Sequence, residues 1–152
     1  MEKKYILTEE TKEFEGHILH RIQAVRDFGD VQAGELGGWI ESEKNLSHDG
    51  ECWVFENGMV SGNGKVFGNA RIGKNGYISS PRSHFVQGPI GSRDDFLTCY
   101  LDKDKKIYAI TGCFSGTLEE FEKKVKDTHG DSKHAQQYLK AAEMARVMLS
   151  GD

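Results

Sequence analysis

Aliphatic residues recur at every sixth position through the middle of the chain, at Val54, Val60, Val66, Ile72 and Ile78. Three positions after each of the first four comes an asparagine, followed by a glycine or alanine. A short fixed period predicts units that stack on one another with the aliphatic side chains pointing inward. Asparagine and glycine suit left-handed corners, where side-chain amides can bond along the stack. The asparagines are Asn57, Asn63, Asn69 and Asn75.

The segment before the repeat predicts β-structure. Residues 5–7 are apolar and residues 17–25 alternate apolar positions, which favours a β-hairpin or two short strands. Residues 9–16 between them are polar and predict a turn. Three further apolar residues are spaced by six but lie two positions out of phase with the main series, which predicts an irregular first coil: Ile40, Leu46 and Cys52.

The period ends after Ile78, and a different kind of sequence follows. Thr117 and Glu120 have the spacing of a capping box, which predicts the start of a helix. We therefore predict two domains, 1–80 with the strands and the repeat, and 81–152 as an α+β module. The module is predicted to contain a hairpin of 96–101 and 106–111, a tight loop at 112–116, and helices at 117–129 and 132–149.

The units at 66–71 (VFGNAR) and 72–77 (IGKNGY) resemble the hexapeptide-repeat proteins of the left-handed parallel β-helix superfamily. The resemblance covers about residues 40–79. It implies a mainly β fold: a short parallel β-helix, or hexad solenoid, followed by a small α+β module. Members of the superfamily often form trimers, and many are acyl- or acetyltransferases. The segments 37–40 and 50–53 also look like uncharacterised bacterial and phage β-helix proteins.

Composition narrows the class of protein. Hydrophobic residues make up 37% and charged residues 29% of 152 residues, with a net charge of −4, which predicts an ordered protein with no nucleic-acid partner. No apolar run approaches membrane-spanning length, so no membrane partner is expected. The start of the chain lacks the apolar stretch of a signal peptide. Three cysteines without C-x-x-C spacing predict reduced thiols in the cytoplasm.

Two glycine-rich segments, 88–93 and 112–117, are the strongest candidates for a ligand site. The predicted hairpin would bring them together, and arginine and a helix start both suit anions. We predict an anionic ligand held by Arg82, His84, Ser92, Arg93, Ser115 and Thr117. The alternative is structural: Arg93 pairs with a neighbouring acidic residue, and Thr117 only caps the helix.

No catalytic residue, metal site or cofactor is predicted, because the six histidines are scattered without metal-ligand spacing. The resemblance implies a catalytic histidine and coenzyme A binding for acyltransferases, yet the four regular units contain no histidine and no inserted loop. We therefore expect a non-enzymatic, trimeric, phage-type protein that sequesters a small nucleotide-like anion to counter a host defence signal. The alternative is a protein-interaction module without a small ligand, and an acyltransferase-like enzyme is less favoured.

Overall fold

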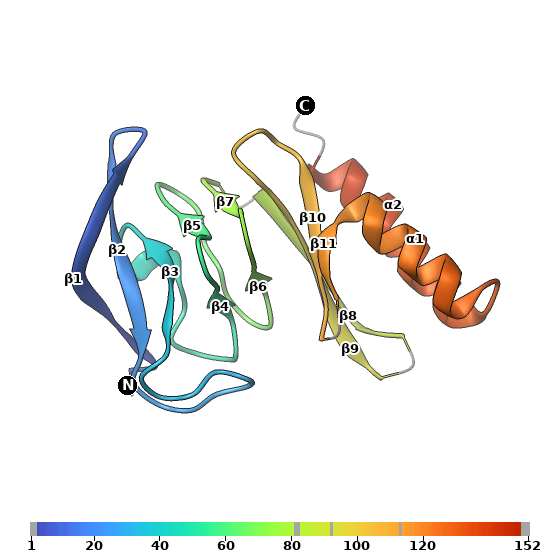
Figure 1. Ribbon diagram of the computed structural model, residues 1–152, viewed down its shortest axis with the longest axis horizontal. Helices are drawn as coiled ribbons and strands as arrows, with labels where there is room; N and C mark the ends of the chain where they lie inside the picture. Colours follow the sequence, from blue (N-terminus) through green and yellow to red (C-terminus); the bar gives the residue numbers. More distant parts are fainter. Residues whose placement is uncertain (1–2, 81–82, 92, 113, 150–152) are drawn as a thin grey trace.

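The computed structural model describes residues 3–80, 83–91, 93–112 and 114–149 (Figure 1). The strands are β1 (Tyr5–Phe14), β2 (His17–Ala24), β3 (Leu36–Ile40), β4 (Trp53–Val54), β5 (Met59–Val60), β6 (Arg71–Ile72), β7 (Tyr77–Ile78), β8 (His84–Ile90), β9 (Asp95–Leu101), β10 (Ile107–Ile110) and β11 (Ser115–Thr117). The helices are α1 (Leu118–His129) and α2 (Lys133–Leu149), with a short 3₁₀ turn, η1 (Glu43–Asn45).

The described strands form three separate sheets. One has the order β1-β2-β3-β5-β7, the second has the order β11-β10-β9-β8, and the third pairs only β4 with β6. The first mixes antiparallel and parallel pairs, and the second is antiparallel throughout. The prediction of a mainly β fold built on a short parallel β-helix is therefore wrong. The molecule has mixed sheets and two helices, and no solenoid is found in the described part of the chain.

The reason lies in how the repeat hydrogen-bonds. Its strands are only two residues long, and Val54 pairs with Ile72 while Val60 pairs with Ile78, in different sheets. The antiparallel β1–β2 hairpin joins β3 and extends one of these sheets. Val66 makes only an isolated bridge, to Leu46. The six-residue period therefore marks which residues face inward, without producing a continuous coil.

The inward orientation itself is confirmed. All five aliphatic residues of the period are at most 1% exposed and belong to one core with Ile40, Leu46 and Cys52. The side-chain amide of Asn57 donates to Asn75 Oδ1 at 3.0 Å, so the predicted amide contact along the stack exists at this corner. The N-terminal hairpin is also confirmed, although β1 continues to Phe14 through residues that predicted a turn.

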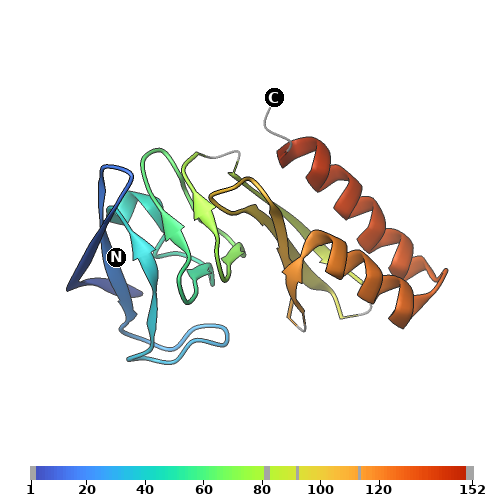
Figure 2. The same ribbon diagram turned by 45° about the horizontal axis from the view of Figure 1, so that its top comes forward.

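The four-stranded sheet lies between two cores (Figures 1 and 2). Successive residues of a strand point to opposite faces. Cys99 accordingly packs in the core that includes both helices, and Tyr100 packs in the core of the repeat. Each face of β9 is therefore covered by a different part of the chain. The proposed boundary between 1–80 and 81–152 stays a prediction.

Both predicted helices are confirmed at nearly the predicted bounds. Thr117 caps α1 in a reciprocal capping box with Glu120, and Leu118, Phe121 and Val125 form the buried stripe. The predicted hairpin is confirmed as β9 and β10, and β8 and β11 are additional strands that the sequence did not predict. Neither α1 nor α2 combines the length and the apolar character that crossing a membrane requires.

Candidate functional site

The structure separates the residues predicted to bind an anion. Arg82 and Ser92 lie outside the described residues. His84 begins β8 opposite Tyr100, whereas Arg93 is exposed in the turn beyond the other end of β8. His84 and Arg93 therefore do not meet. Ser115 opens β11 and Thr117 closes it, next to α1.

The meeting of the two glycine-rich segments stays a prediction. In the four-stranded sheet, β9 and β10 lie between β8, which ends at Ile90, and β11, which begins at Ser115. Two backbone donors of the segment 112–117 are already used. Gly112 N–H donates to Asp95 Oδ2 at 2.9 Å, across the β9–β10 hairpin. Thr117 N–H donates to Glu120 Oε1 at 2.9 Å, and Glu120 N–H donates to Thr117 Oγ1 at 3.1 Å. Cys99 faces Ala109, one residue beyond the predicted register. The anion site stays a prediction, and these donors do not supply it.

His84 is buried in an unusual way. Its Nδ1 is buried without a hydrogen-bond partner among the described residues, and its ring meets Phe67 edge-on at 6.4 Å. Burial lowers the pKa of the imidazole because the charged form loses water. This environment favours a neutral ring, which is poorly suited to hold an anion.

An aromatic pocket of about 70 Å³ lies beside the 112–117 segment, between α1 and α2. Phe121 is its centre, 5.5 Å from the Phe114 ring and 5.6 Å from the Tyr138 ring. Lys124 and His129 also line the pocket and bring cationic or titratable groups to an otherwise apolar wall. The pocket has the lining of a site for a small ring-shaped group.

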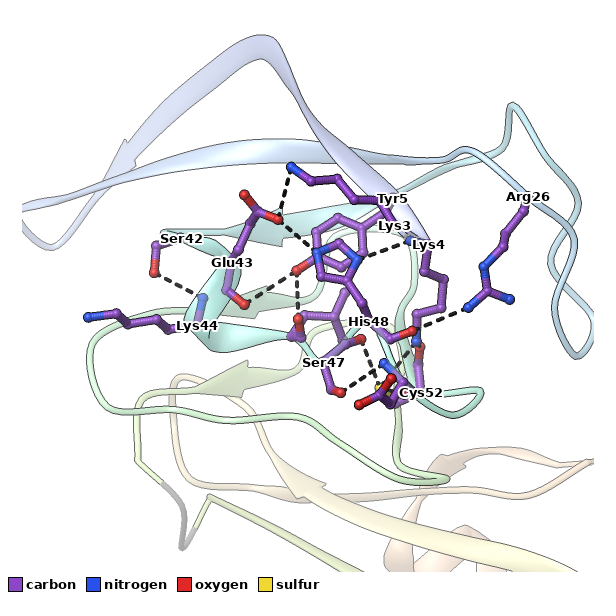
Figure 3. A network of polar contacts seen from close by, with 12 residues as sticks. Lys3, Lys4, Tyr5, Arg26, Ser42, Glu43, Lys44, Ser47, His48 and Cys52 are labelled. Atoms are coloured by element: carbon purple, nitrogen blue, oxygen red, sulfur yellow. Dashed lines mark hydrogen bonds and ion pairs between the residues drawn. The ribbon is translucent and has the colours of Figure 1, made fainter. Parts of the chain in front are cut away.

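A buried polar network ties the start of β1 to residues 42–52 (Figure 3). Lys4 N–H donates to His48 Nδ1 at 3.0 Å, which leaves the ring proton on Nε2, where it faces Glu43 Oε1 at 2.7 Å. The ring stacks on Tyr5 at 4.1 Å, and Tyr5 donates to Leu46 O at 2.6 Å. Both nitrogens of His48 are thus engaged, so this network holds structure and offers no free base.

The electrostatics of this network agree with a structural role. The hydrogen bond from His48 holds the pKa of Glu43 below its usual value. Burial raises the pKa of the Tyr5 hydroxyl. Glu43 therefore stays ionised and Tyr5 stays protonated near neutral pH, and neither group is poised to exchange a proton.

His17 and Glu41 form an open pair with different properties. His17 Nδ1 lies 3.0 Å from Glu41 Oε2, and each side chain is 35% exposed. Glu41 Oε1 accepts the backbone N–H of Gly62 at 2.7 Å. The ionised Glu41 carboxylate can only accept a hydrogen bond, so the ring proton of His17 lies on Nδ1 and the lone pair lies on Nε2. Nε2 has no hydrogen bond within the described ranges, so the ring can accept a proton.

The ionisation of Glu41 favours this arrangement. The hydrogen bond from His17, with a second one from Gly62 N–H, lowers the pKa of the Glu41 carboxyl. An ionised carboxylate that fixes the tautomer of a histidine and stabilises its cation is the orienting element of many general bases.

A cleft of about 310 Å³ lies near the pair, although neither His17 nor Glu41 lines it. Gly62 makes the connection, because a Cβ placed on it would lie 3.9 Å from His17 Cε1 and 3.7 Å from Ser79 O. Ser79 and Tyr77 line the cleft, together with the apolar side chains of Leu101 and Leu149. Two lysines also line the cleft: Lys103 and Lys105.

Sequence reasoning missed this pair because nothing local links its members. His17 and Glu41 are 24 residues apart. The antiparallel register that pairs His20 with Ile40 brings the start of β2 alongside the end of β3. Only the sheet connects them, and a histidine at the start of an alternating strand is a weak signal. Among the described residues, no cluster of His, Cys, Asp and Glu has the geometry of a metal site.

Comparison with known proteins gives one informative match. The chain is 38% identical over 79 aligned positions to an uncharacterized acetyltransferase, YdcK of Escherichia coli strain K12. The match covers 46% of this chain and only 24% of that protein. No protein-family model matches the chain. The similarity is a distant relationship to a protein named as an acetyltransferase, and it leaves the hexapeptide-repeat superfamily an expectation.

Proposed function

We propose that the chain is an acyl-transfer module in which His17, oriented by Glu41, acts as the general base. The observation that carries the proposal is the 3.0 Å contact between His17 Nδ1 and Glu41 Oε2, which leaves Nε2 available. The base would remove the proton of an acceptor hydroxyl or amine as that group attacks the acyl carbonyl. The partial similarity to a protein named as an acetyltransferase supports the same reaction class.

The pair also answers the main objection from the sequence, which was the absence of histidine from the regular six-residue units. His17 comes from the N-terminal hairpin, and its partner Glu41 follows β3. A base therefore reaches the repeat from outside it. Gly62, which belongs to the repeat, fixes the far oxygen of Glu41.

The nearby cleft supplies the features that an acyl donor requires. Leu101 and Leu149 offer an apolar wall for the acyl chain, and Lys103 and Lys105 offer cations for a phosphate-bearing carrier. Ser79 lines this cleft, and its carbonyl oxygen lies near Gly62, whose N–H holds Glu41. We assign the donor to this cleft and the acceptor to the side of His17.

The test measures thiol release from acetyl-coenzyme A in the presence of a panel of amine and hydroxyl acceptors. His17→Gln should lower the rate by about 10²–10⁴-fold, the usual contribution of a general base. His20→Gln is the matched control, because His20 is a half-buried histidine of the same strand. Wild-type protein without activity, or a His17→Gln rate equal to that of the control, would sink the proposal.

A second candidate is non-enzymatic binding of a small nucleotide-like anion in the C-terminal module. The aromatic pocket around Phe121, with Lys124 and His129 in its lining, favours it. Thermal-shift measurements with linear and cyclic nucleotides test this candidate, with Lys124→Ala and Arg93→Ala as variants. A shift that Lys124→Ala abolishes supports the Phe121 pocket, a shift that only Arg93→Ala abolishes supports the turn at 88–93 instead, and no shift with any nucleotide removes the candidate.

A further inference from the structure

The side chain of Lys4 is fully buried and has no carboxylate within ion-pair distance in the described segments. Its Nζ donates to Cys52 O at 2.7 Å and to Gly50 O at 3.3 Å, and it lies 3.4 Å from Cys52 Sγ. The ring of Phe28 closes another side, 4.8 Å from Nζ. Figure 3 shows the amine and the sulfur side by side.

Burying an amine in this way is costly unless its hydrogen bonds are satisfied. Burial lowers the pKa of Lys4, and neighbouring Cys52 only partly opposes that effect. At a given pH, a larger fraction of Lys4 is therefore in the neutral amine form than for an exposed lysine. The neutral amine carries a nucleophilic lone pair, and the Cys52 sulfur lies 3.4 Å from it.

The sulfur is equally constrained. Cys52 is fully buried, and its Sγ lies 3.6 Å from Ser47 O and 3.7 Å from Val66 O. Burial raises the pKa of this thiol. The other described cysteine, Cys99, is also buried, but it packs in the apolar core beneath the helices without a lysine at hydrogen-bond distance. The two thiols therefore offer a matched comparison.

We propose that Lys4 and Cys52 form a covalent nitrogen–oxygen–sulfur bridge when the protein meets a peroxide. Nζ and Sγ lie 3.4 Å apart, in direct contact, so a small approach of the lysine side chain brings them within the span of one bridging oxygen. The modification joins the residue just before β1 to the residue just before β4. It is independent of the acyl-transfer proposal, since neither Lys4 nor Cys52 touches the His17–Glu41 pair.

The chemistry proceeds in two oxidations. In the first, the sulfur attacks a hydrogen peroxide molecule, a sulfur–oxygen bond forms as the peroxide bond breaks, and the products are a sulfenic acid and water. In the second, another peroxide molecule accepts the electron pair as the nitrogen–oxygen bond forms. The amine loses one hydrogen and the sulfenic acid loses its own, and two further waters leave. The net change is the gain of one oxygen atom and the loss of two hydrogen atoms.

Local opening of the loop 49–51 would give the oxidant a route to the pair. Asp49 O lies 3.8 Å from Sγ and Gly50 O lies 3.3 Å from Nζ, so the backbone of this loop forms part of the wall. The loop residues 49–51 are themselves exposed. Exposed loops open locally at low free-energy cost, which admits a molecule as small as peroxide.

The bridge would cross-link positions 48 residues apart in sequence. Closing a loop of this length restricts the unfolded chain and stabilises the folded one in the chain-entropy description of cross-links. Oxidation should therefore raise the unfolding temperature, and a thiol reductant that cleaves the bridge should return it to its starting value.

The test treats the purified full chain with hydrogen peroxide and maps it by intact and tandem mass spectrometry. We expect a cross-linked peptide pair that contains Lys4 and Cys52, with one added oxygen and two fewer hydrogens. Trypsin should no longer cleave after Lys4, and reductant should restore cleavage. Cys99→Ala should retain the cross-link, whereas Cys52→Ser and Lys4→Arg should lose it.

Two results would overturn the proposal. One is Cys52 oxidised to sulfenic or sulfinic acid while Lys4 stays unmodified. The other is peroxide treatment that leaves both residues unchanged under conditions that oxidise exposed methionines such as Met148, which is 56% exposed. Both readouts come from the wild-type protein, so they hold even if a variant folds poorly.

Discussion

The hydroxyl of Tyr100 donates a 3.0 Å hydrogen bond to the backbone carbonyl of Lys74. This contact joins β9 of the four-stranded sheet to the turn between β6 and β7. Gly73 leaves the space for it, because a Cβ at that position would lie 2.8 Å from the hydroxyl. Burial raises the pKa of Tyr100, so the hydroxyl stays protonated and remains a donor near neutral pH.

Replacing Tyr100 by Phe should lower the free energy of unfolding by about 1–3 kcal/mol, because a buried hydrogen bond is lost and the Lys74 carbonyl loses this donor. Urea unfolding measures the change. Tyr108→Phe is the control, since its half-buried hydroxyl has only a 3.4 Å contact with Asn75. Equal losses in the two variants would show that the 3.0 Å bond has no special importance.

Truncating Ile72 to Ala should cost about 2–5 kcal/mol of unfolding free energy, through lost burial and the cavity left behind. Ile72 is fully buried in the core of the repeat. The same truncation at Ile18, which is 53% exposed, should cost less than about 1 kcal/mol. Chemical denaturation of both variants compares them, and similar values would contradict the inward orientation of the repeat.

Thr117→Ala should lower stability by about 1 kcal/mol, because the variant removes the cap of α1. Ser115→Ala, two residues earlier and exposed on β11, should change stability little. Thermal unfolding provides the measurement. If Thr117→Ala leaves the unfolding temperature unchanged, then the capping box does not stabilise the helix.

The ion pair between Glu122 and Arg146 should make stability depend on pH. Both guanidinium terminal nitrogens lie 2.6 Å from the carboxylate oxygens, and their hydrogen bonds lower the pKa of Glu122. A lowered folded-state pKa contributes stability that is present above the unfolded value, about pH 4.3, and is lost as pH falls through the folded value.

Unfolding temperatures measured from about pH 7 down to about pH 3 would reveal this contribution. The difference between wild type and Glu122→Gln should be largest near neutral pH and shrink toward acid. Glu143→Gln is the control, because the Glu143–Lys140 pair is exposed and separated by 3.8 Å. A gap for Glu122→Gln that stays constant over the range would contradict the expected linkage.

The sequence predicted local features well and the sheet arrangement poorly. The six-residue period correctly marked buried positions such as Val60, and the spacing of Thr117 and Glu120 correctly marked a helix start. Both depend on neighbours along the chain. The pairing of strands depends on segments that are distant in sequence. The β1–β2 hairpin joins β3, β5 and β7 in one mixed sheet.

The candidate sites show the same limit. The β9–β10 hairpin was predictable to within one residue of register. The sequence could not predict that the Asp95 carboxylate accepts the N–H of Gly112. The position of that carboxylate depends on the conformation of the turn. The His17–Glu41 pair requires a sheet register that no local pattern encodes.

The alternation along β9 has a consequence for how the molecule unfolds. Cys99 belongs to the core beneath the helices and Tyr100 to the core of the repeat, so one backbone segment serves both. If either core loosens, one face of β9 loses the side chains that cover it. The two halves of the chain therefore share their stability, and heat should melt them together in a single cooperative step.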